Sequence, residues 1–291
     1  MAKSAFVAVV GRPSAGKSTL VNALCGGKVS IVSPVPQTTR NAVRGILNRP
    51  EGQLVLMDTP GFHLSEKKLN KRLGNVAREA FGDADIVLYL LDSTRPPGRE
   101  EEALVEALKP VSKLVVVAIN KVDAKESHPA EAETFVAARL AGSPVLSISA
   151  LAKSGLEELL ALLFSRAEEG PTWYPEEYYT DQEPVFRIAE IIREKVMLRS
   201  REELPHAVYV AYQDSSREQD GTLEAAYDLV VERESQKGIL IGKGGSMIKR
   251  IREEAEADLA GIFDYPIRLR LRVRVDPDWR SDDKRLKELI F

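Results

Sequence analysis

The octet GRPSAGKS, from Gly11 to Ser18, follows an apolar run directly and leads directly into a helical pattern. It fits the phosphate-binding loop G-x-x-x-x-G-K-[ST]. Gly11 and Gly16 allow a tight loop whose amides point inward, Lys17 reaches the outer phosphates of a nucleotide, and Ser18 can ligate a magnesium ion. A chain with this octet must therefore join a strand, a glycine turn and a helix N-terminus around an anion.

Short apolar runs alternate with helical patterns through the first half of the chain. The runs read as buried strands at 6–10, 54–57, 86–91, 114–119 and 145–148. Such alternation predicts an α/β domain with a mostly parallel sheet, helices on both faces and ligands beyond the carboxyl ends of the strands. A helix at 154–165 is expected to begin with a capping box formed by Ser154 and Glu157.

Length and composition favour two globular domains. The 291 residues exceed one typical domain, 44% are hydrophobic and 29% are charged. We predict a first domain at 1–170, a linker at 171–184 rich in proline, acidic and aromatic residues, and a second domain at 185–291.

The apolar runs are too short to span a bilayer, so we expect a cytoplasmic protein. We interpret the single cysteine, Cys25, as a core thiol.

The second domain should be α+β. Its patterns predict helix, strand, strand, helix, helix and strand in that order. The expected bounds are 185–199, 207–213, 227–232, 238–241, 246–260 and 267–275.

Three further motifs end successive predicted strands and point to a guanine nucleotide. In Asp58-Thr59-Pro60-Gly61, Asp58 can hold a metal through water and the Gly61 amide can sense a terminal phosphate. In Asn120-Lys121-Val122-Asp123, the Asp123 carboxylate can accept from two guanine nitrogens, which disfavours adenine and an ATPase. Asn120 should tie this motif to the phosphate loop, Lys121 can lay its stem over the base, and Ser149-Ala150-Leu151 offers a backbone amide. The residues predicted to bind GTP and GDP are Gly11, Arg12, Pro13, Ser14, Ala15, Gly16, Lys17, Ser18, Thr19, Asp58, Thr59, Pro60, Gly61, Phe62, Asn120, Lys121, Val122, Asp123, Ser149, Ala150 and Leu151.

Hydrolysis of GTP requires in-line attack by water while Mg²⁺ and Lys17 offset phosphate charge. The predicted metal ligands are Ser18, Thr39 and, through water, Asp58, with Thr38 as the alternative to Thr39. Lys17, Thr39 and Gly61 are the predicted catalytic residues. Phe62 stands where many related GTPases have a water-orienting Gln, so we expect slow intrinsic turnover, with Arg40 or Arg44 as candidate charge donors.

A glycine-rich break in the second domain predicts an RNA contact. Gly242-Lys243-Gly244-Gly245 fits the G-x-x-G loop with which KH domains clamp the backbone of single-stranded RNA, and residues 237–252 hold five basic residues and no acidic one. The predicted RNA-binding residues are Lys237, Ile241, Gly242, Lys243, Gly244, Gly245, Lys249 and Arg250. Arginines alternate along 268–274, either as a solvated strand face or as a second RNA contact.

The segments GRPSAGKST, PQTTR, DTPGFH, NKVD, SALAKSG, YPEEYYTD and LVVERESQKGILIGKGG resemble the Era family of bacterial ribosome-assembly GTPases. The resemblance implies a GTPase domain followed by a type II KH domain, binding near the 3′ end of 16S ribosomal RNA, maturation of the small (30S) subunit and peripheral contact with the inner membrane. We expect a monomer. A hydrophobic residue at Phe62 is usual in the family. Ser14 departs from it, because relatives often carry an Asn tied to potassium there, so the resemblance does not extend to potassium-stimulated hydrolysis.

Two interpretations remain open for the nucleotide. In the first, GTP orders residues 33–44 and 58–80 and changes the placement of the KH domain, as in a switch. In the second, the chain is an RNA-binding assembly platform with GTP as a structural ligand, which the missing Gln favours.

Overall fold

The computed structural model describes residues 2–62, 82, 84–200, 203–277, 279, 280, 282 and 286. Two compact units make up the chain, and the main division falls between Asp181 and Gln182. No helix in this described part is long and apolar enough to cross a bilayer.

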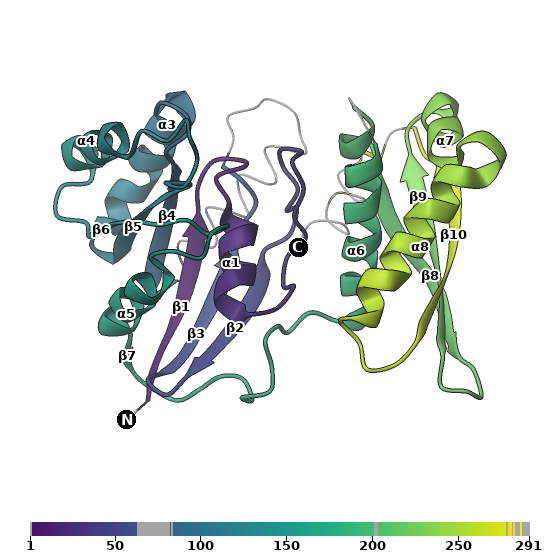
Figure 1. Cartoon of the computed structure of the whole chain (residues 1–291), viewed down its shortest axis with the longest axis horizontal. Coiled ribbons are helices and arrows are strands. Elements are labelled where there is room, and N and C mark those ends of the chain that lie inside the picture. The colour runs from purple at the N-terminus through teal and green to yellow at the C-terminus, as the bar shows by residue number, and fades with distance from the viewer. Residues whose placement is uncertain are drawn as a thin grey trace. The chain divides into compact units, whose positions relative to one another are not determined.

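The first unit is built on one sheet with the strand order β2-β3-β1-β4-β5-β6, and β7 pairs with β1 (Figure 1). Its strands are β1 Lys3–Val10, β2 Val43–Arg49, β3 Gly52–Asp58, β4 Ile86–Asp92, β5 Val115–Asn120, β6 Val145–Ser147 and β7 Glu168–Glu169. β2 and β7 run antiparallel to their neighbours and the other pairs are parallel. The predicted, mostly parallel sheet is confirmed, and β3, β4 and β5 are buried over their whole length because helices cover both faces.

Among the described residues of the first unit, four α-helices cover this sheet. They are α1 Lys17–Cys25, α3 Arg99–Leu108, α4 Pro129–Arg139 and α5 Leu156–Arg166. α3 and α4 share one hydrophobic core with Tyr89, Val117 and other side chains from one face of the sheet. α1 contacts β2 and β3, while α5 contacts β1, which covers the opposite face.

The predicted capping box of α5 is wrong. Gly155, with a φ of 71°, is the N-cap, and no side-chain cap hydrogen bond is present. A Cβ at Gly155 would lie 2.8 Å from the Ser147 carbonyl oxygen, so the chain needs a left-handed glycine turn there, and the helix begins at Leu156, two residues after the predicted start. Glu157 instead pairs with Arg49 at 2.9 Å.

The first part of the predicted linker, residues 171–181, packs on β2 and β3. The buried Gln53 accepts hydrogen bonds from the backbone N–H groups of Trp173 and Tyr174 at 2.8 and 3.1 Å, and donates to the Tyr174 carbonyl oxygen at 2.8 Å. Asp181 accepts from Arg44 and from the Tyr174 hydroxyl, each at 2.9 Å. These contacts place residues 171–181 with the first unit.

The second unit has a three-stranded sheet in the order β10-β9-β8, and the helices α6, α7 and α8 pack on one of its faces (Figure 1). Its elements are α6 Pro184–Arg199, β8 Tyr209–Arg217, β9 Leu223–Val231, α7 Glu234–Ile241, α8 Ser246–Ala260 and β10 Ile267–Val275. β9 pairs antiparallel with β8 and parallel with β10. The predicted order of elements is confirmed, and α7 begins at Glu234, four residues before the predicted bound.

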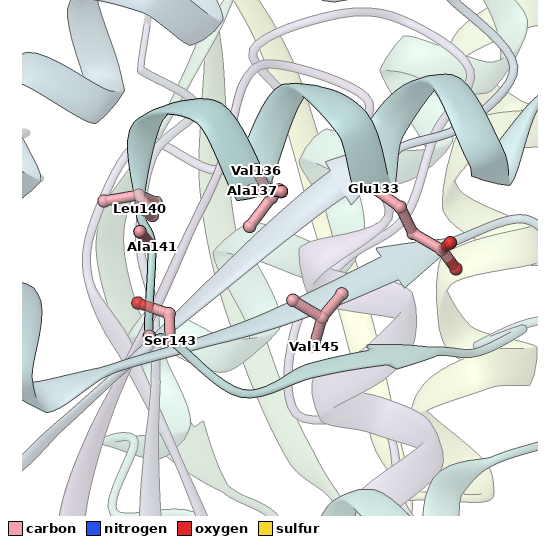
Figure 2. A pocket seen from close by; sticks show the side chains of 8 residues that line it. Glu133, Val136, Ala137, Leu140, Ala141, Ser143 and Val145 are labelled. Atoms are coloured by element: carbon pink, nitrogen blue, oxygen red, sulfur yellow. The ribbon is translucent and has the colours of Figure 1, made fainter.

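A hollow lies between α4 and the edge strand β6, and Glu133, Val136, Leu140 and Val145 are among the residues that line it (Figure 2). No residue that we predict to bind nucleotide or RNA lines this hollow.

Candidate nucleotide site and RNA-binding loop

The phosphate loop joins β1 to α1 at the carboxyl edge of the sheet. Gly16 is the N-cap of α1, with a φ of 98°, and a Cβ there would clash with the Asn120 side-chain amide. Lys17 is buried, and its Nζ donates to the carbonyl oxygens of Gly11 and Arg12, both at 3.1 Å. Burial lowers the pKa of Lys17 to about 8, although the nearby Asp58 opposes the shift. The ammonium group therefore lies folded across the loop.

The three predicted metal ligands come together beside α1. Ser18 Oγ lies 3.0 Å from Thr39 Oγ1, which in turn lies 3.5 Å from Asp58 Oδ2. Asp58 is fully buried, and its Oδ1 has no hydrogen-bond partner among the described residues. Burial raises the pKa of Asp58, against the effect of Lys17. Two hydroxyl oxygens and a carboxylate with one unused oxygen form a donor set that fits Mg²⁺.

The segment after β3 is tied to the phosphate loop. The Thr59 hydroxyl donates to the Val9 carbonyl oxygen at 2.8 Å, and the Phe62 backbone N–H donates to the Gly11 carbonyl oxygen at 3.0 Å. The Phe62 side chain is buried in the core beneath α3 and α4. Phe62 therefore anchors this segment and presents no polar group to a water. Residues 63–80 of the predicted second switch lie outside the described residues.

Asn120 makes the predicted tie between loops. Its Nδ2 donates to the Ala15 carbonyl oxygen at 2.8 Å, and its Oδ1 accepts from the Ala150 backbone N–H at 2.9 Å. Val122 is connected to the same region, because its N–H donates to the Ile148 carbonyl oxygen at 3.3 Å. One buried amide thus holds the phosphate loop and the two predicted guanine loops together, and Asp123 and Leu151 are exposed on those loops.

Asp92 at the end of β4 is a site residue that we did not predict. Its Oδ2 accepts from Lys121 Nζ at 2.8 Å and lies 3.7 Å from Arg12 Nη2, while Arg12 Nη1 lies 3.0 Å from Glu101 on α3. Asp92 is the last residue of an apolar run, at the sheet edge where the other motifs meet. Its place at the end of a strand on this edge is the sequence feature that could have indicated a site residue.

Arg44, which we predicted as a candidate charge donor, instead pairs with Asp181.

The G-x-x-G loop turns between α7 and α8. Gly242, Gly244 and Gly245 have φ values of 71°, 60° and 78°, and Gly245 is the N-cap of α8. Lys243 is exposed on this loop and has no ion pair among the described residues. The loop therefore combines a free ammonium group with the amides of a helix N-terminus, which together attract phosphate.

The positive charges of the other predicted RNA-binding residues are partly balanced by nearby glutamates. Lys237 and Lys249 each lie 3.8 Å from a glutamate, and Arg250 pairs with Glu254 at 3.0 Å. The Lys237 pair lies within α7 and the other two lie within α8. All three are at the surface, so they add little to stability and leave the cations available.

The arginines of β10 pair with acidic side chains of β8, β9 and the turn between them. Arg268 contacts Glu218, Arg270 contacts Asp214 and Glu224, and Arg272 and Arg274 share the buried Asp228. This ladder supports the interpretation as a solvated strand face.

The geometry defines a P-loop GTPase domain followed by a KH domain. The family model described as 50S ribosome-binding GTPase matches residues 6–121, and the KH domain model matches residues 203–280. GTPase Era of Treponema denticola is 46% identical to this chain, and that of Borreliella burgdorferi is 43% identical, each with 99% of both chains covered.

Solved structures agree with these relatives. Era from Aquifex aeolicus bound to GDP and AlF4⁻ has a TM-score of 0.93 at 35% identity, covering 99% of this chain and 98% of that chain. Era in complex with MgGDPNP and nucleotides 1506–1542 of 16S ribosomal RNA has a TM-score of 0.95 at 33% identity, covering 99% of each chain. The chain belongs to the Era family of GTPases.

Proposed function

We propose that this GTPase binds the 3′ region of 16S ribosomal RNA through its KH unit and acts in the cytoplasm in maturation of the small (30S) ribosomal subunit. The observation that carries the proposal is the G-x-x-G loop, with exposed Lys243 at the N-terminus of α8. The Era structure that contains an RNA fragment covers 99% of this chain, which supports the same class of ligand.

In the proposed hydrolysis, the chain's own residues hold the phosphates and position the reacting groups. The loop from Gly11 to Ser18 surrounds the phosphates, and Lys17 turns its ammonium group from backbone carbonyls to phosphate oxygens. Ser18, Thr39 and Asp58 would hold Mg²⁺, which offsets the charge that develops on the phosphates. Because the residue directly after Gly61 is the buried, apolar Phe62, that position offers no polar side chain to orient water, and we propose slow intrinsic turnover.

The test is GTP turnover by the purified chain, with and without a short single-stranded RNA that copies the 3′ end of small-subunit ribosomal RNA. We expect RNA to raise turnover, Lys17→Ala to abolish it, and Gly244→Asp to remove the stimulation while the RNA-free rate persists. A Cβ at Gly244 meets open space, but its φ of 60° strains any side chain there, so a matched variant has to separate the repulsion of phosphate from backbone strain.

Gly221→Asp is the matched control. Gly221 lies in the turn between β8 and β9, also has a positive φ of 86°, and a Cβ there also meets open space. Gly221→Asp should keep the stimulation. Equal loss in both variants would show that the effect is on folding and would contradict the proposed RNA site.

The second candidate is an RNA-binding platform for which GTP is a structural ligand. The burial of Phe62 in place of a polar residue is the observation that favours it. Tight GTP binding without turnover, with or without RNA, would support the platform and contradict the switch.

A further inference from the structure

The carboxylate of Asp92 contacts two of the predicted nucleotide motifs at once. Asp92 Oδ2 accepts from Lys121 Nζ at 2.8 Å, and Arg12 of the phosphate loop lies 3.7 Å from the same oxygen. Asp92 is 1% exposed, whereas the Lys121 side chain is 33% exposed. The carboxylate is thus a fixed point beneath a side chain that reaches the surface.

The two oxygens of Asp92 have different partners. Oδ1 accepts from the backbone N–H of Thr94 at 3.0 Å and from the Thr94 hydroxyl at 2.6 Å. These two bonds set the orientation of the carboxylate, which leaves Oδ2 directed at Lys121 and Arg12. A buried carboxylate with this many donors is held firmly in its charged form.

Lys121 is constrained from both ends. Its backbone lies in the left-handed region, with a φ of 68°, and its ammonium group is held by Asp92. Between these two points the aliphatic stem has little rotational freedom. A stem fixed before the ligand arrives loses less conformational entropy when a base packs against it.

We propose that Asp92 is a positioning residue for guanine-nucleotide binding: it holds the stem of Lys121 in place for the base and, through Arg12, links the base side of the site to the phosphate loop. Arg12 also contacts Glu101, so the same network connects the phosphate loop to α3. Asp92 acts through Lys121 and does not contact the reacting phosphate.

A double-mutant cycle on GDP affinity tests this role, with Asp92→Asn and Lys121→Ala made singly and together in the full chain. We expect Asp92→Asn to weaken GDP binding about tenfold, and about twofold or less when Lys121 is already Ala, since only the longer contact with Arg12 is then left to lose. The KM for GTP should rise with little change in kcat at saturation, because the lost contact is made equally in the ground and transition states. The same factor in both backgrounds, or an unchanged affinity, would overturn the proposal.

Asp85→Asn is the control for structural loss. Asp85 lies just before β4, at the opposite end from Asp92, and its carboxylate accepts from the Phe6 backbone N–H at 2.8 Å. This variant should lower the melting temperature and keep the GDP affinity; an equal loss of affinity would also overturn the proposal. If Asp92→Asn does not fold, Thr94→Ala is the substitute, because it removes one of the two hydrogen bonds to Asp92 Oδ1. We expect Thr94→Ala to weaken GDP binding about threefold when residue 121 is Lys and to have no such effect in the Lys121→Ala variant.

Discussion

Lys17 carries the charge in the phosphate loop that responds to pH near neutrality. Burial lowers its pKa to about 8, and bound phosphates favour the ammonium form and raise the pKa again. Below pH 8 the free protein already holds the proton, so Lys17 adds no pH dependence to binding. Above pH 8 the proton must be taken up on binding, and GDP affinity should fall by up to about tenfold per pH unit. Titration calorimetry at pH 7 and pH 9, in buffers of different ionisation enthalpy, measures this uptake.

Lys17→Arg is the matched variant, because a guanidinium group stays charged across this range. It should bind GDP more weakly than the native protein and show no added proton uptake at pH 9. Uptake of the same size in Lys17→Arg would assign the titration to another group.

The residues that the motifs predict meet in the structure because each motif ends a strand at the same edge of a parallel sheet. Ser18 and Asp58 converge for this reason, whereas Thr39 precedes β2, which runs antiparallel to β3 and so begins at the same edge. Asp92 ends a strand at the same edge, but it belongs to no motif that marks it as a site residue. Its partners Lys121 and Arg12 lie 29 and 80 positions away along the chain, and its own neighbours form an ordinary strand end. Phe62 likewise lies in the core that α3 and α4 share with the sheet, which its local sequence does not reveal.

The outer face of β10 offers a test of how one strand is stabilised. Arg272 and Arg274 pair with Asp228 at 3.0 and 3.3 Å, and Asp228 is 0% exposed. Replacing both arginines by Ala leaves a buried carboxylate without these partners and should lower the free energy of unfolding by about 1 to 3 kcal/mol. Denaturant unfolding can be followed through the buried Trp279 in a Trp173→Phe background.

Arg270→Ala is the control on the same strand and the same face. Its partners Asp214 and Glu224 keep contact with water, so the loss should be below about 0.5 kcal/mol. Equal losses for the two changes would show that Asp228 does not depend on its arginines.

The elements with a strong periodic signal matched their predicted bounds. Strict alternation gave β10 as Ile267–Val275, and an apolar stripe after a glycine break gave α8 as Ser246–Ala260. β8 extends to Arg217, beyond the predicted bound, because the polar residues of its hairpin arm carry no apolar signal. The edge strand β2 was not predicted, since its ladder to β3 is a contact that local sequence does not reveal. The predicted start of α5 was wrong because it depends on the close approach of Gly155 to β6, a tertiary contact that the local sequence does not reveal.

The net charge of the chain is −3, so any attraction to RNA must come from a local group of cations. The same chain spreads its motifs over two units, with the nucleotide residues before Asp181 and the G-x-x-G loop after Gln182. Local sequence patterns predict the nucleotide residues and the G-x-x-G loop. They do not predict that residues 171–181 pack on β2 and β3, because those contacts join residues more than 100 positions apart.

A compact cation group predicts a modest salt dependence of RNA binding. Lys237, Lys243, Lys249 and Arg250 supply about four phosphate contacts, so the logarithm of the binding constant should fall with the logarithm of salt concentration with a slope of about −3. Lys243→Ala should reduce the steepness by about 0.7, because Lys243 has no competing ion pair among the described residues. Arg270→Ala should leave the slope unchanged, since the Arg270 charge is already balanced by Asp214 and Glu224. Fluorescence anisotropy of a labelled single-stranded RNA across a salt series measures all three slopes. A native slope near −10 would mean that a far larger surface binds RNA, and a shift with Arg270→Ala would assign the outer face of β10 to the interface.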